Sequence, residues 1–338
     1  SCILQTARQP SRSRMICKSA SSMFANMLQR SVVAAPRAGV SGLPRRMGAK
    51  AAADFQVVDV FTDAAYNGNP TCVCFLPAGL DASDAWMSKV AMETLQPSTS
   101  FVDTSARSYR VFNPTGNEMP LLSGHSTLGV AAALMRREPG EPDITLSSKY
   151  GPVRMTFDGA MYEIGLPLGT GAAIDQSPPI PKVLGALGLR DPAEVLNSGS
   201  VFGGKYFFAE VTPAAFAGLT PDISTIREMT QGMYGFLVTA AGMPSPHAAC
   251  PTPDTVDFSV RNFIPQLGCD EDVATGSIQA FLNPYWTAKL GRDPGVPMMC
   301  WQNSRRGGLV RSKLQGTSVL VAGQCAFSFD GRAPGPTM

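Results

Sequence analysis

Runs of apolar and β-branched residues alternate with turn-forming residues at the start of the regular part of the chain. "FQVVDVFT" (55–62) and "TCVCFL" (71–76) predict two strands, with the turn-rich "DAAYNGNP" (63–70) between them. "DASDAWMSKVAMETL" (81–95) begins with a capping Asp and has apolar residues at helical spacing, which predicts an amphipathic helix. This succession indicates a fold that mixes strands and helices.

The same patterns recur along the rest of the chain. "GHSTLGVAAALMRRE" (124–138) predicts a second helix. A Gly- and Pro-rich stretch at 168–182 has the composition of an interdomain linker. Beyond it, further strand patterns surround one helix that we expect to begin near Thr275. The sequence therefore predicts an α+β fold with an N-terminal domain at 51–167 and a C-terminal domain at 183–338.

Two segments, one in each predicted domain, share a pattern. "FNPTGNEMPLLSGHS" (112–126) and "FIPQLGCDEDVATGS" (263–277) each run Phe, Pro two residues later, Gly, Glu, and a hydroxyl residue followed by Gly. In both, a predicted helix follows the last glycine, Gly124 or Gly276. The repeat predicts two pseudo-symmetric domains related by an approximate two-fold axis.

The two glycine-led helix starts are candidates for an anion-binding active site. Such a start leaves backbone N–H groups without partners, and the helix dipole adds partial positive charge there. If both starts face one cleft, they can bind a small carboxylate and stabilise the negative charge that develops on proton removal. His125 and Asp272 would then take and return protons. The expected substrate-binding residues are Gly124, Ser126, Gly276 and Ser277.

Charge is distributed unevenly between the beginning of the chain and the rest. Residues 1–50 contain nine Lys or Arg residues and no Asp or Glu, which leaves 19 basic and 26 acidic residues in the remainder. A basic, Ser-rich leader of this kind predicts an organellar transit peptide, for a plastid or a mitochondrion. The alternative is a basic tail that binds an anionic partner, with the protein then in the cytoplasm.

Several classes of protein are disfavoured by composition. No apolar run approaches the roughly eighteen residues that a membrane span requires. The eight cysteines show no CxxC spacing, which argues for reduced thiols and against a structural metal site. The mildly acidic body, without interleaved basic and aromatic residues, gives no support to nucleic-acid binding. We therefore expect a globular protein with no metal, nucleic-acid or membrane partner.

Four ordered motifs resemble the signature segments of the phenazine-biosynthesis isomerase (PhzF-like) family, whose fold is shared with the diaminopimelate epimerases. They are "VFTDAAYNGNPTCVCFL", "EMPLLSGHSTLG", "DEDVATGSIQAFLNPYW" and "QNSRRGG", and the resemblance covers roughly residues 54–325. It implies two domains, each a curled sheet around a central helix, with a cofactor-free active site between them. It also implies acid/base proton transfer on a small carboxylate, and a homodimer.

Carried over by motif, His125 matches the family's active-site histidine, Asp272 its aspartate and Ser277 its closing serine. The family's glutamate falls at Ser98, in "PSTSFV". A serine hydroxyl is far too weakly acidic to cycle protons near neutral pH in that glutamate's place. The sequence therefore leaves two interpretations open: a PhzF-like isomerase or epimerase, or an altered, catalytically inactive member with a ligand-binding or assembly role.

Each candidate residue also has a plain structural interpretation. A hydrogen bond at a helix start would account for His125, and an Asp such as Asp272 caps free N–H groups there. Glu118 and Glu271 occupy matching positions in the two repeats, either as substitute acid/base groups or as buried hydrogen-bond acceptors. The pair Arg305–Arg306 would either close over a substrate carboxylate or simply form a turn.

Overall fold

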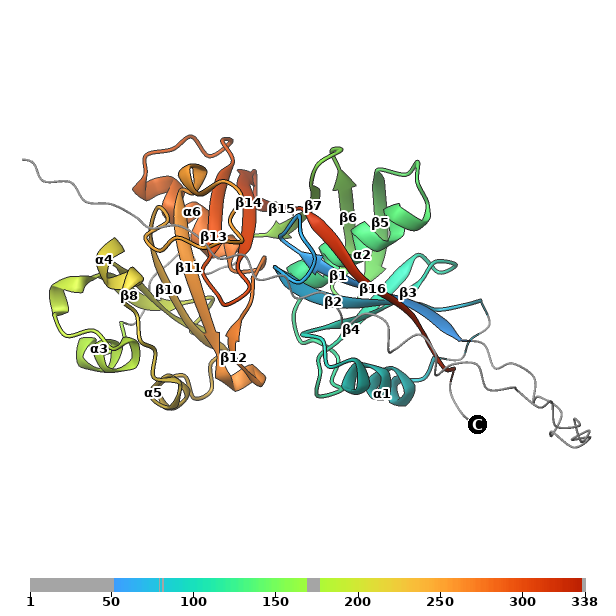
Figure 1. Cartoon of the computed structure of the whole chain (residues 1–338), viewed down its shortest axis with the longest axis horizontal. Helices are drawn as coiled ribbons and strands as arrows, with labels where there is room; N and C mark the ends of the chain where they lie inside the picture. Colours follow the sequence, from blue (N-terminus) through green and yellow to red (C-terminus); the bar gives the residue numbers. More distant parts are fainter. Residues whose placement is uncertain (1–51, 79, 81, 169–176, 336–338) are drawn as a thin grey trace, which may run out of the picture. The chain divides into compact units, whose positions relative to one another are not determined.

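The computed structural model describes residues 52–78, 80, 82–168 and 177–335 (Figure 1). The predicted leader and most of the predicted linker lie outside these residues. The first half of the described chain contains β1 (Ala53–Val60), β2 (Asn69–Phe75), α1 (Asp84–Thr94), β3 (Thr99–Asp103), β4 (Ser108–Phe112), α2 (Gly124–Arg137), β5 (Asp143–Ser148), β6 (Gly151–Phe157) and β7 (Tyr162–Pro167).

The second half follows the same plan with more helices. It contains α3 (Ile180–Leu187), β8 (Val195–Val201), β9 (Tyr206–Val211), α4 (Pro213–Ala217), α5 (Ile223–Met229), β10 (Gly235–Ala241), β11 (Phe258–Ile264), β12 (Cys269–Asp272), α6 (Gln279–Lys289), β13 (Met298–Gln302), β14 (Gly308–Gln315), β15 (Ser318–Gly323) and β16 (Cys325–Ala333). No helix in the described part of the chain is long and apolar enough to cross a membrane.

The strand pairings of the two halves are the same. From β1 to β7 in order, neighbours pair antiparallel, parallel, antiparallel, parallel, antiparallel and antiparallel. The path β8-β9-β10-β11-β13-β14-β15 has the identical series. In each half the longest helix, α2 or α6, follows the fourth strand of the path. The predicted α+β fold with two pseudo-symmetric halves is therefore confirmed.

The two halves join through equivalent strands, and the last strand of the chain, β16, belongs to the sheet of the first half. β7 pairs antiparallel with β15, so one sheet path runs through both halves. β16 pairs antiparallel with β1 along its length and extends the sheet of the first half. The domain division at 168–182 stays a prediction, but Cys325–Ala333 depart from it, because they pair with the first half although they follow the second in sequence.

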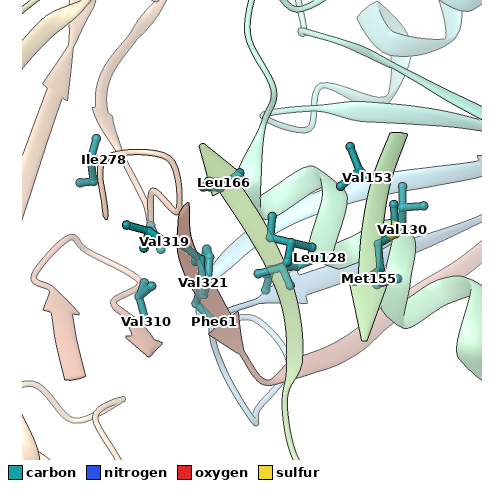
Figure 2. Close-up of a cluster of buried hydrophobic side chains, with 14 of the residues drawn as sticks. Phe61, Leu128, Val130, Val153, Met155, Leu166, Ile278, Val310, Val319 and Val321 are labelled. Atoms are coloured by element: carbon teal, nitrogen blue, oxygen red, sulfur yellow. The ribbon is translucent and has the colours of Figure 1, made fainter. Parts of the chain in front are cut away.

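The helix α2 is buried on all sides from Gly124 to Met135, as expected for a helix enclosed by a curled sheet. A methyl group on Gly129 would lie 2.2 Å from Cγ2 of Thr71, so α2 approaches β2 too closely for any side chain there. Figure 2 shows side chains from both halves that belong to one buried cluster, among them Leu128 on α2 and Ile278, which precedes α6. One hydrophobic core therefore spans both halves.

Two helix boundaries differ from the sequence prediction. α6 begins at Gln279 instead of near Thr275, because its N–H bonds to the Gly276 carbonyl in a tight turn that precedes the helix. The first helix begins at Asp84 and is capped by the Ser83 hydroxyl, which accepts from the N–H of Trp86. The capping residue is therefore Ser83, and Asp81, the first residue of the predicted segment, lies outside the described residues.

Candidate active site

The start of α2 lies against the turn that leads into α6, and we call these two segments, at Gly124 and at Gly276, the helix starts. A methyl group on Gly124 would be 3.1 Å from the Cα atom of Gly276 and 3.2 Å from the backbone nitrogen of Ser277. Both contacts are with backbone atoms and would be tight for a side chain, so glycine at position 124 favours this close approach. Among the described residues, the N–H groups of Gly124, His125, Gly276 and Ser277 have no hydrogen-bond partner. Two sets of free donors therefore meet at one place.

The carboxyl group of Asp272, in the turn that leads to α6, is surrounded by donors. Its Oδ1 accepts from Nδ2 of Asn69 at 2.9 Å and from the N–H of Val273 at 2.9 Å, and its Oδ2 accepts from the hydroxyl of Thr275. Burial raises the pKa of Asp272 above its ordinary value, and these three donors only partly offset that effect. The group is therefore suited to holding a proton and releasing it.

The Thr275 hydroxyl donates its hydrogen to the Asp272 carboxyl group. Its oxygen accepts from Nδ2 of Asn262 at 2.9 Å and from Nε2 of Gln302 at 3.2 Å, so the hydrogen is left for Asp272. Gln302 also accepts from the Thr275 N–H and donates to the Asp272 carbonyl. The second half thus fixes one side of the Asp272 carboxyl through Thr275 and Gln302, and Asn69 of the first half fixes the other.

His125 belongs to a closed ring of side chains, which we call the hydroxyl ring: Ser98, Ser123, His125 and Ser126. The Nε2 atom of His125 lies 3.0 Å from the Ser98 hydroxyl and its Nδ1 atom lies 3.3 Å from the Ser123 hydroxyl. The Ser126 hydroxyl is 2.6 Å from both serine oxygens and closes the ring. Thr71 adds a hydroxyl 2.8 Å from that of Ser98.

The hydroxyl ring changes what His125 can do. Both imidazole nitrogens are engaged within the ring, and the side chain is buried. Burial lowers the pKa of His125 to about 4, so the imidazole is neutral near neutral pH. Ser98 is fully buried in the same ring. His125 lies at the first helix start, as the sequence predicts, and Ser98 joins it there in an internal hydrogen-bond network.

The ring and the Asp272 carboxyl are linked through β2. Asn69 and Thr71 are two residues apart on this strand, so their side chains point to the same face. Asn69 contacts Asp272, and Thr71 contacts Ser98 of the ring. The two serines predicted to bind substrate differ in their surroundings. Ser126 is part of the ring, whereas the Ser277 hydroxyl has no hydrogen-bond partner among the described residues and is partly exposed.

The paired glutamates of the repeat have equivalent structural roles. Arg110 donates from Nε and Nη2 to Glu118 at 3.3 and 2.9 Å, and Arg261 donates in the same way to Glu271 at 2.7 and 2.8 Å. Each guanidinium also lies over the ring of the Phe two residues later, at 5.2 and 4.9 Å. The hydrogen-bond-acceptor interpretation therefore holds for both glutamates. The arginines were missed, although "RVFNP" and "RNFIP" extend the repeat by two residues.

Asn69 was not a candidate from the sequence, and Arg306 was one only together with Arg305, as a group that closes over a carboxylate or forms a turn. The Asn69 amide reaches across to Asp272, 203 positions away in sequence. The side chain of Arg306 bonds to the turn between β1 and β2, whereas Arg305 is exposed. Within the described residues, no group of three or more His, Cys, Asp or Glu side chains is arranged to hold a metal ion.

Comparison with known proteins identifies relatives along most of the chain. A family model described as phenazine biosynthesis-like protein matches residues 58–331. An uncharacterised isomerase of Halalkalibacterium halodurans is 30% identical over 270 residues, which cover 79% of this chain and 93% of that protein. A crystal structure of a PhzF-family phenazine biosynthesis protein from Enterococcus faecalis is 28% identical, with a TM-score of 0.70 over 84% of this chain and 99% of that one. A predicted epimerase of Pseudomonas aeruginosa, 21% identical with a TM-score of 0.62, covers 85% of this chain and 100% of its own, and shares the fold.

Proposed function

The chain belongs to the phenazine biosynthesis-like protein family, and on that premise we propose that it is an isomerase that moves a proton within a small carboxylate substrate. The observation that carries this proposal is the meeting of two glycine-led helix starts beside the Asp272 carboxyl group, which Asn69 links across the two halves. As in the family it resembles, the proton moves by acid/base chemistry of protein side chains.

The free N–H groups at the two starts supply the binding energy for an anion. A substrate carboxylate placed there accepts hydrogen bonds from Gly124 and His125 on one side and from Gly276 and Ser277 on the other. Negative charge that develops on the carboxylate oxygens during proton removal is stabilised by the same donors. A single preorganised donor of this type contributes about 10²–10³ in rate.

Asp272 supplies the proton transfer. Its carboxylate removes a proton from a substrate carbon, and the electron pair of the C–H bond moves into the adjacent unsaturated system and onto the bound carboxylate. The protonated Asp272 then returns its proton to a second carbon, which restores the carboxylate of Asp272 and leaves an isomer of the substrate. The raised pKa of Asp272 favours both steps, because the group holds the proton between them.

Solvent exchange tests the proposal. The protein is incubated in D₂O with a panel of small unsaturated and amino carboxylic acids, and deuterium uptake at carbon is followed by NMR. Asp272→Asn is expected to slow uptake by about 10²–10⁴-fold. Asp270→Asn is the matched control, because Asp270 is an exposed carboxyl two residues away whose partner is Arg227 at 3.1 Å. Exchange by Asp272→Asn within tenfold of wild type would contradict the assignment.

A second candidate function, binding without catalysis, is favoured by the hydroxyl ring. Ser98 stands where the family's glutamate falls, and its hydroxyl closes a network around His125 instead of presenting an acid. A protein of this type would bind small carboxylates at the helix starts and leave their protons in place. Carboxylate binding detected by calorimetry, with no deuterium uptake in any member of the panel, would select this function.

A further inference from the structure

The guanidinium group of Arg306 bridges the two halves next to the proposed site. Arg306 lies in the connection between β13 and β14, yet all its hydrogen bonds go to the first half. Its Nε donates to the Gly68 carbonyl at 2.8 Å, and its Nη2 donates to the Asn67 carbonyl at 2.9 Å and to Oδ1 of Asp59 at 2.7 Å. The planar group therefore holds the β1–β2 turn from the opposite half.

Asp59 closes this turn from the other end. Its carboxylate is 2% exposed, and Oδ2 accepts from the Tyr66 N–H at 2.7 Å while Oδ1 pairs with Arg306. The turn is tightly wound: Tyr66 and Gly68 have positive φ values of 72° and 60°, and a methyl group on Gly68 would lie 2.3 Å from the Val60 carbonyl oxygen. Such a turn keeps its shape only while its polar groups stay paired.

Asn69 is the next residue after this turn. Its side chain is fully buried, and Nδ2 donates both to Oδ1 of Asp272 at 2.9 Å and to the Ala274 carbonyl at 2.7 Å. The amide is the contact of the first half with the Asp272 carboxyl. The position of that contact follows directly from the turn that Arg306 holds.

The segment that carries Arg306 also contacts the backbone at Asp272. Gln302 bonds to the Asp272 carbonyl, and the Ser304 hydroxyl donates to the Val273 carbonyl at 2.6 Å. In the segment 302–306, Gln302 and Ser304 therefore hold the backbone of Asp272 and Val273, and Arg306 holds the β1–β2 turn. The loop sets the distance between the two groups.

We propose that Arg306 is a positioning residue, which acts through the β1–β2 turn to keep the Asn69 amide on the Asp272 carboxyl group. This inference rests on the proposed function only in giving Asp272 its catalytic role. Arg306 itself contacts neither the carboxyl group nor the helix starts. Its effect on the reaction passes through Asn69.

The experiment measures Asp272 directly and needs no substrate. The pKa of Asp272 is followed by carbon-13 NMR of its side-chain carboxyl, assigned by its absence in Asp272→Asn. Asn69→Ala removes one donor from the carboxylate and is expected to raise this pKa by about one unit. Arg306→Gln is expected to raise it by a similar amount, because the freed turn lets Asn69 leave the carboxyl group.

Two comparisons separate positioning from a general electrostatic or structural effect. In the Asn69→Ala background, Arg306→Gln is expected to add less than about 0.3 of a unit, since its route to Asp272 is already cut. Arg306→Lys retains the positive charge but not the planar donor set, so it is expected to resemble Arg306→Gln. The matched control is Arg305→Gln, which removes an exposed neighbouring charge and should leave the pKa of Asp272 as in wild type.

Additive shifts in the double variant, full restoration by Arg306→Lys, or an unshifted Asp272 in folded Arg306→Gln would each overturn the proposal. If Arg306→Gln does not fold, Asp59→Asn removes the same ion pair from the side of the turn and is judged by the same outcomes. In the D₂O assay, the Arg306→Gln variant is expected to show both a lower exchange rate and a shifted pH profile of that rate. A protein that shows the Asp272 shifts but no exchange in any variant would contradict the proposed function and leave the role of Arg306 standing.

Discussion

The protonation of His125 is the property of the site that most directly separates a buried network from a catalytic base. The imidazole is buried within the hydroxyl ring, and this burial lowers its pKa from 6.5 to about 4. An unfolded chain protonates this group below about pH 6.5. Between about pH 6.5 and 4 the unfolded state therefore binds more protons than the folded state, so stability falls as the pH is lowered through this window.

The size of this effect follows from the shift. A difference of about 2.5 pKa units corresponds to about 3.5 kcal/mol in total, at roughly 1.4 kcal/mol per unit, and most of it is lost between pH 6.5 and 4. His125→Gln removes the titrating group and keeps a side chain that can both donate and accept. When the pH is lowered from 6.5 to 4, the free energy of unfolding of wild type is expected to fall by about 3 kcal/mol more than that of His125→Gln.

Two measurements check the prediction. Urea unfolding at a series of pH values gives the difference between wild type and variant. The chain contains only two histidines, so NMR resolves two imidazole signals, and the one that His125→Gln removes is His125. A His125 signal that titrates near 6.5 would refute the reasoning, as would parallel pH dependences for the two proteins. In either case the imidazole would be a charged group at the helix start and not part of a neutral ring.

Matched pairs of variants test the other structural claims. Ser98→Ala removes a fully buried hydroxyl bonded to its neighbours and should cost about 1–3 kcal/mol of unfolding free energy, whereas Ser100→Ala removes a buried hydroxyl without a partner among the described residues and should cost nothing. Gly124→Ala should cost about 1–3 kcal/mol by forcing the helix starts apart, whereas Gly185→Ala, in the open middle of α3, should stabilise by about 0.5–1 kcal/mol. Urea unfolding measures all four, and equal effects within either pair would contradict the contact it tests.

The fold was predictable because its main feature is repeated along the chain. The Phe, Pro, Gly and Glu positions of the repeat mark the same turn in both halves, and the glycines that follow mark both buried helix starts. The place of β16 was not predictable in this way. It pairs with β1 through backbone hydrogen bonds, and no local pattern of residues records which distant strand will be the partner.

The two helix starts were predictable from the sequence, whereas the contacts around them were predictable only in part. Helix-start signals identify Gly124 and Gly276, because the geometry they produce is local. One partner of the Asp272 carboxyl, Asn69, lies 203 positions away, and Arg306 lies 238 positions from Gly68 in the β1–β2 turn. A single sequence carries no sign of such pairs. The neutral state of His125 depends on burial inside the ring, which spacing along the chain does not reveal.

The two halves repeat the glycine-led helix start but not the acid. Counting back four residues from each helix-start glycine gives Asp272 in the second half and Pro120 in the first, while His125 and Ser277 occupy equivalent positions just after the glycines. In the first half, the polar side chains at the helix start bond to one another in the hydroxyl ring. In the second half, the Asp272 carboxyl group, with its raised pKa, lies close to the helix start. Inversion at one carbon by two opposed bases needs a proton carrier on each side of the substrate. With one carrier, the same carboxyl group must both remove and return the proton, which favours a shift between two carbons on one face and supports an isomerase over a two-base epimerase.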